Sequence, residues 1–190
     1  LNEHIGCNIG SSTLVNSPFS CLQFVYALSL SNDPLIEEIL QGRIINPGWN
    51  KELGTSLVNR KVLKDLKILD LGCGELPYFV RATRLLGADT YTVDVFPAEV
   101  FDEDADILSE YGYMTQAQRD EEKRKHLQVD LSEEGTLEKI INSTGGNFDL
   151  VTEAHLTSAG FYDGIKLAPL LLKKGGYYFR NDEAFVKIDD

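Results

Sequence analysis

The chain has 190 residues, which is enough for one well-buried core and too few for two comfortable ones. Its 18 basic residues are scattered among 30 acidic ones, giving a formal net charge of −12, and nucleic-acid binding usually needs a clustered basic surface, so no nucleic-acid partner is expected. The three cysteines form no CxxC pair and no histidine pattern lies near them, which indicates a reduced, cytoplasmic protein without a metal site.

Residues 1–64 are expected to form an irregular lead-in followed by a helical extension. The first 17 residues are rich in Asn, Ser, Gly and Thr and show no periodicity. Start and stop signals predict helices over residues 19–30 and 33–41, and apolar spacing predicts a third over 50–64. The apolar segment 19–30 is too short to span a bilayer, so no membrane partner is expected. Because the chain begins at Leu1 rather than methionine, a trimmed or processed piece is expected.

Residues 65–190 alternate between strand and helix patterns, which is typical of a mostly parallel sheet covered on both faces. Short apolar runs predict strands over residues 67–71, 90–95, 126–130, 148–153 and 176–180. Helical spacing predicts helices over residues 77–86, 98–109, 116–125, 137–142 and 161–173. The sequence therefore predicts an α/β, Rossmann-like, doubly wound fold in one compact unit. The few residues after the fifth strand predict either a chain that is cut short or a sheet that is reduced at its C-terminal end.

The first predicted strand runs into two closely spaced glycines, Gly72 and Gly74, and Pro77 follows them. Glycines allow a sharp turn and let the backbone approach a ligand without a Cβ in the way. Pro77 suits the first position of a helix, where its missing N–H costs nothing. A strand, a glycine turn and a helix N-terminus together are typical of a dinucleotide-like site. The same glycines could also serve only a tight strand-to-helix turn.

Acidic residues stand at the ends of the later strands: Asp94 closes the second, Asp130 the third and Glu153 the fourth. In an open parallel sheet, ligands bind outside the carboxyl ends of the strands. Asp94 has the spacing from the glycines at which an acidic side chain accepts hydrogen bonds from ribose hydroxyls. It could instead cap the helix after Pro97, and Asp130 could cap the next helix through Ser132.

Taken in order, these segments resemble motifs of the class I S-adenosylmethionine-dependent methyltransferases, over roughly residues 60–181. The similar segments are ILDLGCG at 68–74, YTVDV at 91–95, LQVD at 127–130, FDLV at 148–151 and LLKKGGY at 171–177. The resemblance implies that S-adenosylmethionine is the cofactor and methyl donor. In such chemistry the enzyme mainly aligns the acceptor for in-line attack and excludes water.

The resemblance also implies which residues hold the cofactor. The two glycines would line its methionine part, with Asp70 beneath them. Asp94 would hold both ribose hydroxyls, and Val95 would pack on the adenine ring. Asp130 and the backbone of Leu131 would face the adenine amino group.

Glu153 and His155 lie two residues apart after the fourth strand, so in a continuing strand they point to one side, where an acceptor would approach. They are candidate catalytic residues, for positioning the acceptor or for general base work. Glu153 could equally contact the cofactor or solvent, and His155 could be an ordinary surface or core histidine. Residues 152–155 lack the Asn/Asp-Pro-Pro-Tyr tetrad of nucleic-acid methyltransferases. A small-molecule acceptor is therefore expected, with a protein side chain as a variant.

Two other functions stay open. Leu76 stands where the family has a third glycine, and this departure, with the missing terminal strands and the acidity, suits a non-catalytic interaction subunit of the same fold with a protein partner. An NAD-dependent oxidoreductase is less favoured, because the glycine run lacks the third glycine of GxGxxG.

Overall fold

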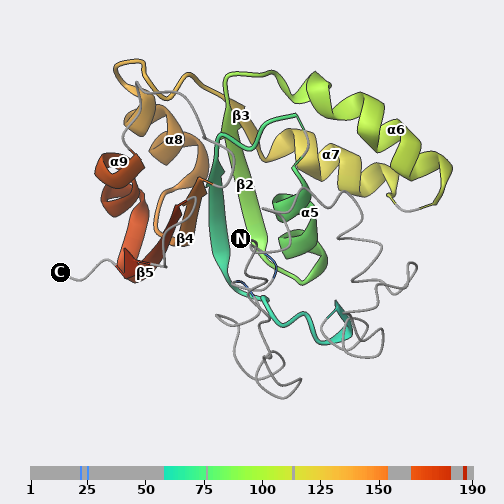
Figure 1. Cartoon of the computed structure of the whole chain (residues 1–190), viewed down its shortest axis with the longest axis horizontal. Helices are drawn as coiled ribbons and strands as arrows, with labels where there is room; N and C mark the ends of the chain where they lie inside the picture. Colours follow the sequence, from blue (N-terminus) through green and yellow to red (C-terminus); the bar gives the residue numbers. More distant parts are fainter. Residues whose placement is uncertain are drawn as a thin grey trace, which may run out of the picture.

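The computed structural model describes residues 22, 25, 58–75, 77–112, 114–153, 164–180 and 186–187. Within them, six strands form one sheet in the order β3-β2-β1-β4-β5-β6 (Figure 1). The first five are parallel, and β6 pairs with β5 in the antiparallel direction. The strands are β1 (Lys67–Leu71), β2 (Asp89–Asp94), β3 (His126–Gln128), β4 (Phe148–Glu153), β5 (Leu172–Arg180) and β6 (Val186–Lys187).

Helices connect the parallel strands and cover both faces of the sheet. Figure 1 shows α8 and α9 on one side of it and α5, α6 and α7 on the other. The helices are α5 (Tyr78–Leu85), the 3-10 helix η1 (Ala98–Phe101), α6 (Asp102–Glu110), α7 (Gln116–Arg124), α8 (Thr136–Thr144) and α9 (Gly164–Leu171). The predicted Rossmann-like α/β fold is confirmed.

The core lies on both faces of β1, because successive side chains of a strand point to opposite sides. Ile68 packs with Phe79 of α5 in one buried cluster. Leu69 packs with Ile140 of α8 in the other. Apolar side chains on both faces of a strand are typical of a central strand in a parallel sheet, and β1 lies at the centre of this sheet. The strand order reverses beside β1, so a crevice at this edge is where ligands bind in such sheets.

The structure differs from the predictions at several boundaries. The predicted helix 50–64 ends at residue 60, and turns follow over 61–65 because Lys61 and Asp65 adopt left-handed backbone angles, with φ of +50° and +70°. The third strand is shorter than predicted and ends at Gln128, and the sheet continues past the fifth strand into β6.

Most of the predicted N-terminal extension lies outside the described residues. Leu22 and Val25 are helical and buried in the same cluster as Phe79. The predicted lead-in over residues 1–17, the helix 33–41 and the division of the chain at residue 65 stay predictions. In the portion that the structure describes, no helix combines the length and the apolar character needed to cross a membrane.

A buried ion pair joins the α6–α7 segment to α5. Arg81 of α5 is 3% exposed, and its Nε and Nη2 donate to Oε1 and Oε2 of Glu122 of α7 at 2.8 and 2.9 Å. Its Nη1 pairs with Asp104 of α6. Burial opposes the charge of Arg81, but the hydrogen bonds and charges of Glu122 and Asp104 outweigh it, so the pKa of this guanidinium lies above its usual range. One guanidinium therefore holds three helices together.

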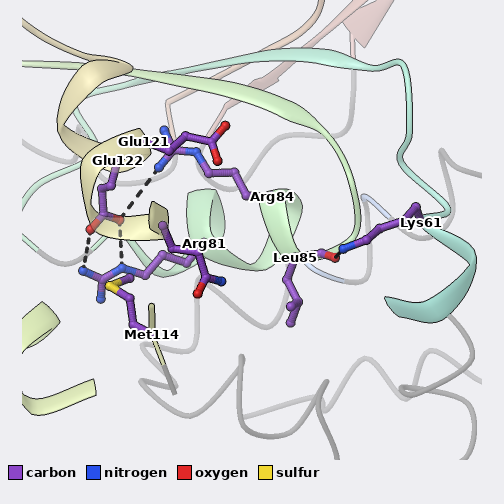
Figure 2. A pocket seen from close by; sticks show the side chains of 8 residues that line it. Lys61, Arg81, Arg84, Leu85, Met114, Glu121 and Glu122 are labelled. Carbon is purple, nitrogen blue, oxygen red and sulfur yellow. Dashed lines mark hydrogen bonds and ion pairs between the residues drawn. The ribbon is translucent and has the colours of Figure 1, made fainter. Parts of the chain in front are cut away.

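A cavity of about 230 Å³ lies beside this pair, between α5 and α7 (Figure 2). Figure 2 shows the guanidinium of Arg81 and the carboxylate of Glu122 pointing toward each other in its wall. The other cations in the wall also have partners. Arg84 donates from Nη2 to the carbonyl of Thr90 at 2.7 Å, and Lys61 Nζ donates to the carbonyl of Leu85 at 2.8 Å. The polar wall is thus satisfied from within the protein.

Helix α7 begins at a capping box, and this predicts a measurable contribution to stability. Thr115 Oγ1 accepts from the backbone N–H of Gln118 at 3.3 Å, and Gln118 Oε1 accepts from the N–H of Thr115 at 2.8 Å. Thr115→Ala is expected to lower the free energy of unfolding by about 1 kcal/mol in urea titrations. Thr115→Ser should stay close to wild type. Equal losses in the two variants would show that the hydroxyl has no capping role.

Candidate functional site

The loop after β1 has the sharp glycine turn that its sequence predicts. Gly72 and Gly74 both have φ of +67°, a backbone conformation that other residues rarely adopt. The N–H of Gly72 donates to the carbonyl of Val93 at 2.7 Å, which ties the loop to β2. A Cβ added at Gly74 would meet no atom of the described residues within 4 Å. The loop therefore has open space beside Gly74, and the glycine is required there by its backbone angle.

Asp94 joins the ends of β1, β2 and β3. Its Oδ2 accepts the N–H of Gly74 at 2.8 Å, and its Oδ1 accepts the N–H of Phe96 at 3.2 Å. Its backbone carbonyl accepts the N–H of Val129 at 2.8 Å. The side chain does not cap η1, where Pro97 stands at the N-cap with no side-chain hydrogen bond. Each carboxylate oxygen has a second lone pair, so each can accept one further hydrogen bond.

Two apolar side chains stand exposed directly after Asp94. Val95 is 51% exposed and Phe96 is 41% exposed, although large apolar side chains usually lie inside. Val95 is the residue that the resemblance assigns to the adenine ring. Its exposure at the carboxyl end of β2 leaves an apolar surface for a flat ligand to cover.

Asp130 follows β3 and makes a local turn. Its Oδ1 accepts from the N–H and from Oγ of Ser132, at 2.8 and 2.6 Å. These bonds lower the pKa of Asp130. Asp130 is exposed and Leu131 is half-buried against the core, while α8 has Gly135 at its N-cap. Asp130 therefore forms this turn and does not cap α8, so its predicted capping role is wrong. Its adenine-facing role stays a prediction.

The turn makes the titration of Asp130 depend on Ser132. Ser132→Ala removes the Oγ donor and keeps the backbone N–H, so the pKa of Asp130 is expected to rise toward the usual range of an aspartate. Carbon NMR of the carboxyl group as a function of pH measures this shift. An unchanged midpoint in Ser132→Ala would contradict the assignment.

Asp70 and Glu153 bring carboxylates to the centre of the sheet. Asp70 is 1% exposed and its Oδ1 accepts from Oγ1 of Thr152 of β4 at 2.6 Å. Glu153, the last residue of β4, is 5% exposed. Thr152 was not predicted from the sequence as a partner of Asp70. A polar residue inside a buried strand needs a hydrogen-bond partner, and this could have indicated Thr152. His155 and Leu76 lie outside the described residues.

Cys73 lies between the two glycines and is 1% exposed. Burial, together with the negative charges of Asp70 and Asp94, raises the pKa of its thiol well above the usual value. A raised pKa leaves very little thiolate at neutral pH, and the thiolate is the reactive form. Cys73 is therefore an inert part of the loop's packing.

The inertness of Cys73 predicts slow alkylation. In the folded protein, iodoacetamide is expected to label the peptide that contains Cys73 at least about tenfold more slowly than in urea, as followed by mass spectrometry. Mass spectrometry distinguishes this peptide from those that contain Cys7 and Cys21, so the labelling rate of Cys73 is measured by itself. Equal rates with and without urea would contradict the buried placement.

The structure thus gathers most of the residues proposed from the sequence at one edge of the sheet. Asp70, the two glycines, Asp94 and Val95 stand at the ends of adjacent strands β1 and β2, and Glu153 ends β4, the other neighbour of β1. Among the described residues, no group of three or more His, Cys, Asp or Glu side chains is arranged to hold a metal ion.

Comparisons with known proteins found a similarity to a solved structure. Neither a protein-family model nor a curated protein matches this chain. Among solved structures, the chain is similar to the X-ray structure of YjhP from E. coli, with 21% sequence identity and a TM-score of 0.37. The match covers 76% of this chain and 54% of that one, so the chain spans about half the length of the structure it matches. This likeness bears on neither activity nor cofactor.

Proposed function

We propose that this chain binds S-adenosylmethionine at the edge formed by β1, β2 and β3, and that it transfers the methyl group to a small-molecule acceptor. The hydrogen bond between the N–H of Gly74 and the carboxylate of Asp94 is the observation that supports this most. It joins a glycine loop of left-handed backbone to an acidic side chain at the next strand end, which is the arrangement expected around a ribose.

The residues at this edge suit the parts of such a ligand. The open space at Gly74 admits a group close to the backbone, and the remaining lone pairs of Asp94 can accept ribose hydroxyls. Val95 offers an exposed apolar side chain to the adenine ring. The buried carboxyl groups of Asp70 and Glu153 place polar oxygens at the same edge, where little water reaches them.

The ligand, when bound, supplies an electrophilic methyl group on a sulfonium. The protein then has to orient the acceptor and exclude water. Where the acceptor must lose a proton, Glu153 and His155 are the proposed groups that take it. Substitution of each, once an acceptor is known, tests this, and unchanged turnover in both variants would remove them from the mechanism.

Calorimetric titration of the wild-type chain tests the proposed ligand. S-adenosylmethionine and its demethylated product, S-adenosylhomocysteine, are expected to bind, and NAD is not. Absence of heat with the first two ligands, at protein concentrations that detect micromolar affinity, would contradict the proposal. Heat with NAD alone would favour an oxidoreductase.

One observation favours the alternative of a non-catalytic subunit of the same fold. Asp94 is 7% exposed and both of its carboxylate oxygens already accept backbone N–H groups, so this edge is satisfied without a ligand. A protein partner would then be the expected ligand. Absence of turnover against broad acceptor panels, with or without binding of S-adenosylmethionine, would support this alternative, and turnover of any acceptor would exclude it.

A further inference from the structure

We propose that His126 and Gln128 of β3 position the loop that carries Val95 and Phe96, and thereby set the affinity for the adenine end of the ligand. This inference rests on the proposed function. It assigns a role to two side chains outside the glycine loop and the acidic strand ends. Both act through the loop, so they are positioning residues and do not touch the reacting atoms.

The carbonyls of two successive loop residues accept hydrogen bonds from β3 side chains. Gln128 Nε2 donates to the carbonyl of Val95 at 3.1 Å, and His126 Nε2 lies 2.8 Å from the carbonyl of Phe96. The donors are two residues apart on β3, so they lie on the same face of that strand. Asp94 Oδ1 holds the N–H of Phe96 from the other side. The loop backbone is thus fixed by three side chains.

The bond to Phe96 also fixes the tautomer of His126. A carbonyl can only accept, so Nε2 carries the hydrogen, and in the neutral ring Nδ1 is then the acceptor. Thr92 Oγ1 lies 2.9 Å from Nδ1 and can donate to it. The ring of Phe101 meets the imidazole edge to face, with centroids 4.9 Å apart and an interplanar angle of 85°. The imidazole ring of His126 is therefore held in one orientation, by hydrogen bonds at both of its nitrogens and by the contact with Phe101.

Fixing the backbone of this loop by hydrogen bonds is expected to add little to the stability of the fold. The side chains that it carries, Val95 and Phe96, are 51% and 41% exposed and so gain little from burial within the protein. A fixed backbone does matter for a ligand that packs on Val95, because binding then pays no ordering cost for the loop. The hydrogen bonds from β3 are therefore expected to affect affinity more than stability.

Four variants, with S-adenosylhomocysteine as the probe, test the inference by calorimetry and thermal unfolding. Gln128→Leu and His126→Phe each remove one donor and are expected to weaken binding about fivefold to tenfold. His126→Gln keeps a donor near the position of Nε2 and should recover most of the affinity. Gln116→Leu, on α7, is the matched control and should bind as wild type does.

Two further measurements separate positioning from a merely structural role. In Val95→Ala, the Gln128→Leu change should have little additional effect on affinity, because the side chain that the loop presents is gone. Nitrogen NMR of wild type should show the tautomer of His126 with hydrogen on Nε2. The effects of Val95→Ala and Gln128→Leu on affinity are thus expected to be non-additive, while their effects on the unfolding temperature are expected to add.

The outcomes distinguish this inference from the proposed function. If Gln128→Leu and His126→Phe both bind the probe as tightly as wild type does, the inference is overturned and the proposed function stands. Additive losses in the Val95→Ala background, or hydrogen on Nδ1, would also overturn it. No binding of the probe by wild type would overturn the proposed function, and the inference with it.

Discussion

Replacing Asp94 by alanine is expected to weaken the binding of S-adenosylhomocysteine by about a hundredfold or more. The variant loses the charged group that we propose as the acceptor for the two ribose hydroxyls, and hydrogen bonds to charged groups are among the stronger ones. It also releases the N–H groups of Gly74 and Phe96, so the glycine loop keeps the backbone bond from Gly72 to Val93 but loses its side-chain link to the end of β2. Calorimetric titration, alongside wild type, measures the effect.

Two further variants keep this test interpretable. Asp94→Asn retains one acceptor oxygen and a similar shape, and it is expected to bind about tenfold more weakly than wild type. Glu138→Gln removes one negative charge from the exposed side of α8 and should leave binding unchanged. An Asp94→Asn protein that unfolds like wild type and binds equally tightly would remove Asp94 from the site.

Arg81→Met is expected to lower the free energy of unfolding by about 3–5 kcal/mol, the largest stability loss among these predictions. Glu122 is 2% exposed, and removal of Arg81 takes away both hydrogen bonds to this buried carboxylate, which keeps the longer ion pair with Arg84 at 3.9 Å. Asp104 loses its partner at the same time. Urea titration monitored by circular dichroism measures the loss.

The matched control is Arg124→Met, because the side chain of Arg124 is 67% exposed and its ion pair with Glu121 is a surface pair. Surface pairs contribute little, so this change should stay within about 1 kcal/mol of wild type. Arg81→Met combined with Glu122→Leu removes both charges and should recover much of the loss. Equal effects of Arg81→Met and Arg124→Met would show that the buried pair is not what attaches α7.

The sequence was sufficient for the parts of the fold that depend on local pattern. The strands over residues 67–71 and 148–153 have the predicted bounds, because short apolar segments mark central strands that are buried on both faces. The glycine turn at Gly72 and Gly74 followed from the need for left-handed backbone. The acidic residue at the end of β2 could be placed because parallel strands end at one edge.

Other features depend on tertiary contacts that no local pattern reports. The charged run of α7 gave no sign that Glu122 is buried, since its partner Arg81 is 41 residues away. Thr152 reaches Asp70 across 82 residues. The strand predicted over 126–130 ends at Gln128, because Asp130 bonds to Ser132 and turns the chain.

Amide hydrogen exchange with and without S-adenosylhomocysteine both detects the proposed ligand and locates it on the chain. Slower exchange is expected in peptides that cover residues 70–78 and 92–97, with no change over α7 beside the cavity that Arg81 and Glu122 line. Unchanged exchange over residues 70–78 and 92–97 at saturating ligand, or protection confined to α5 and α7, would contradict the proposed ligand site.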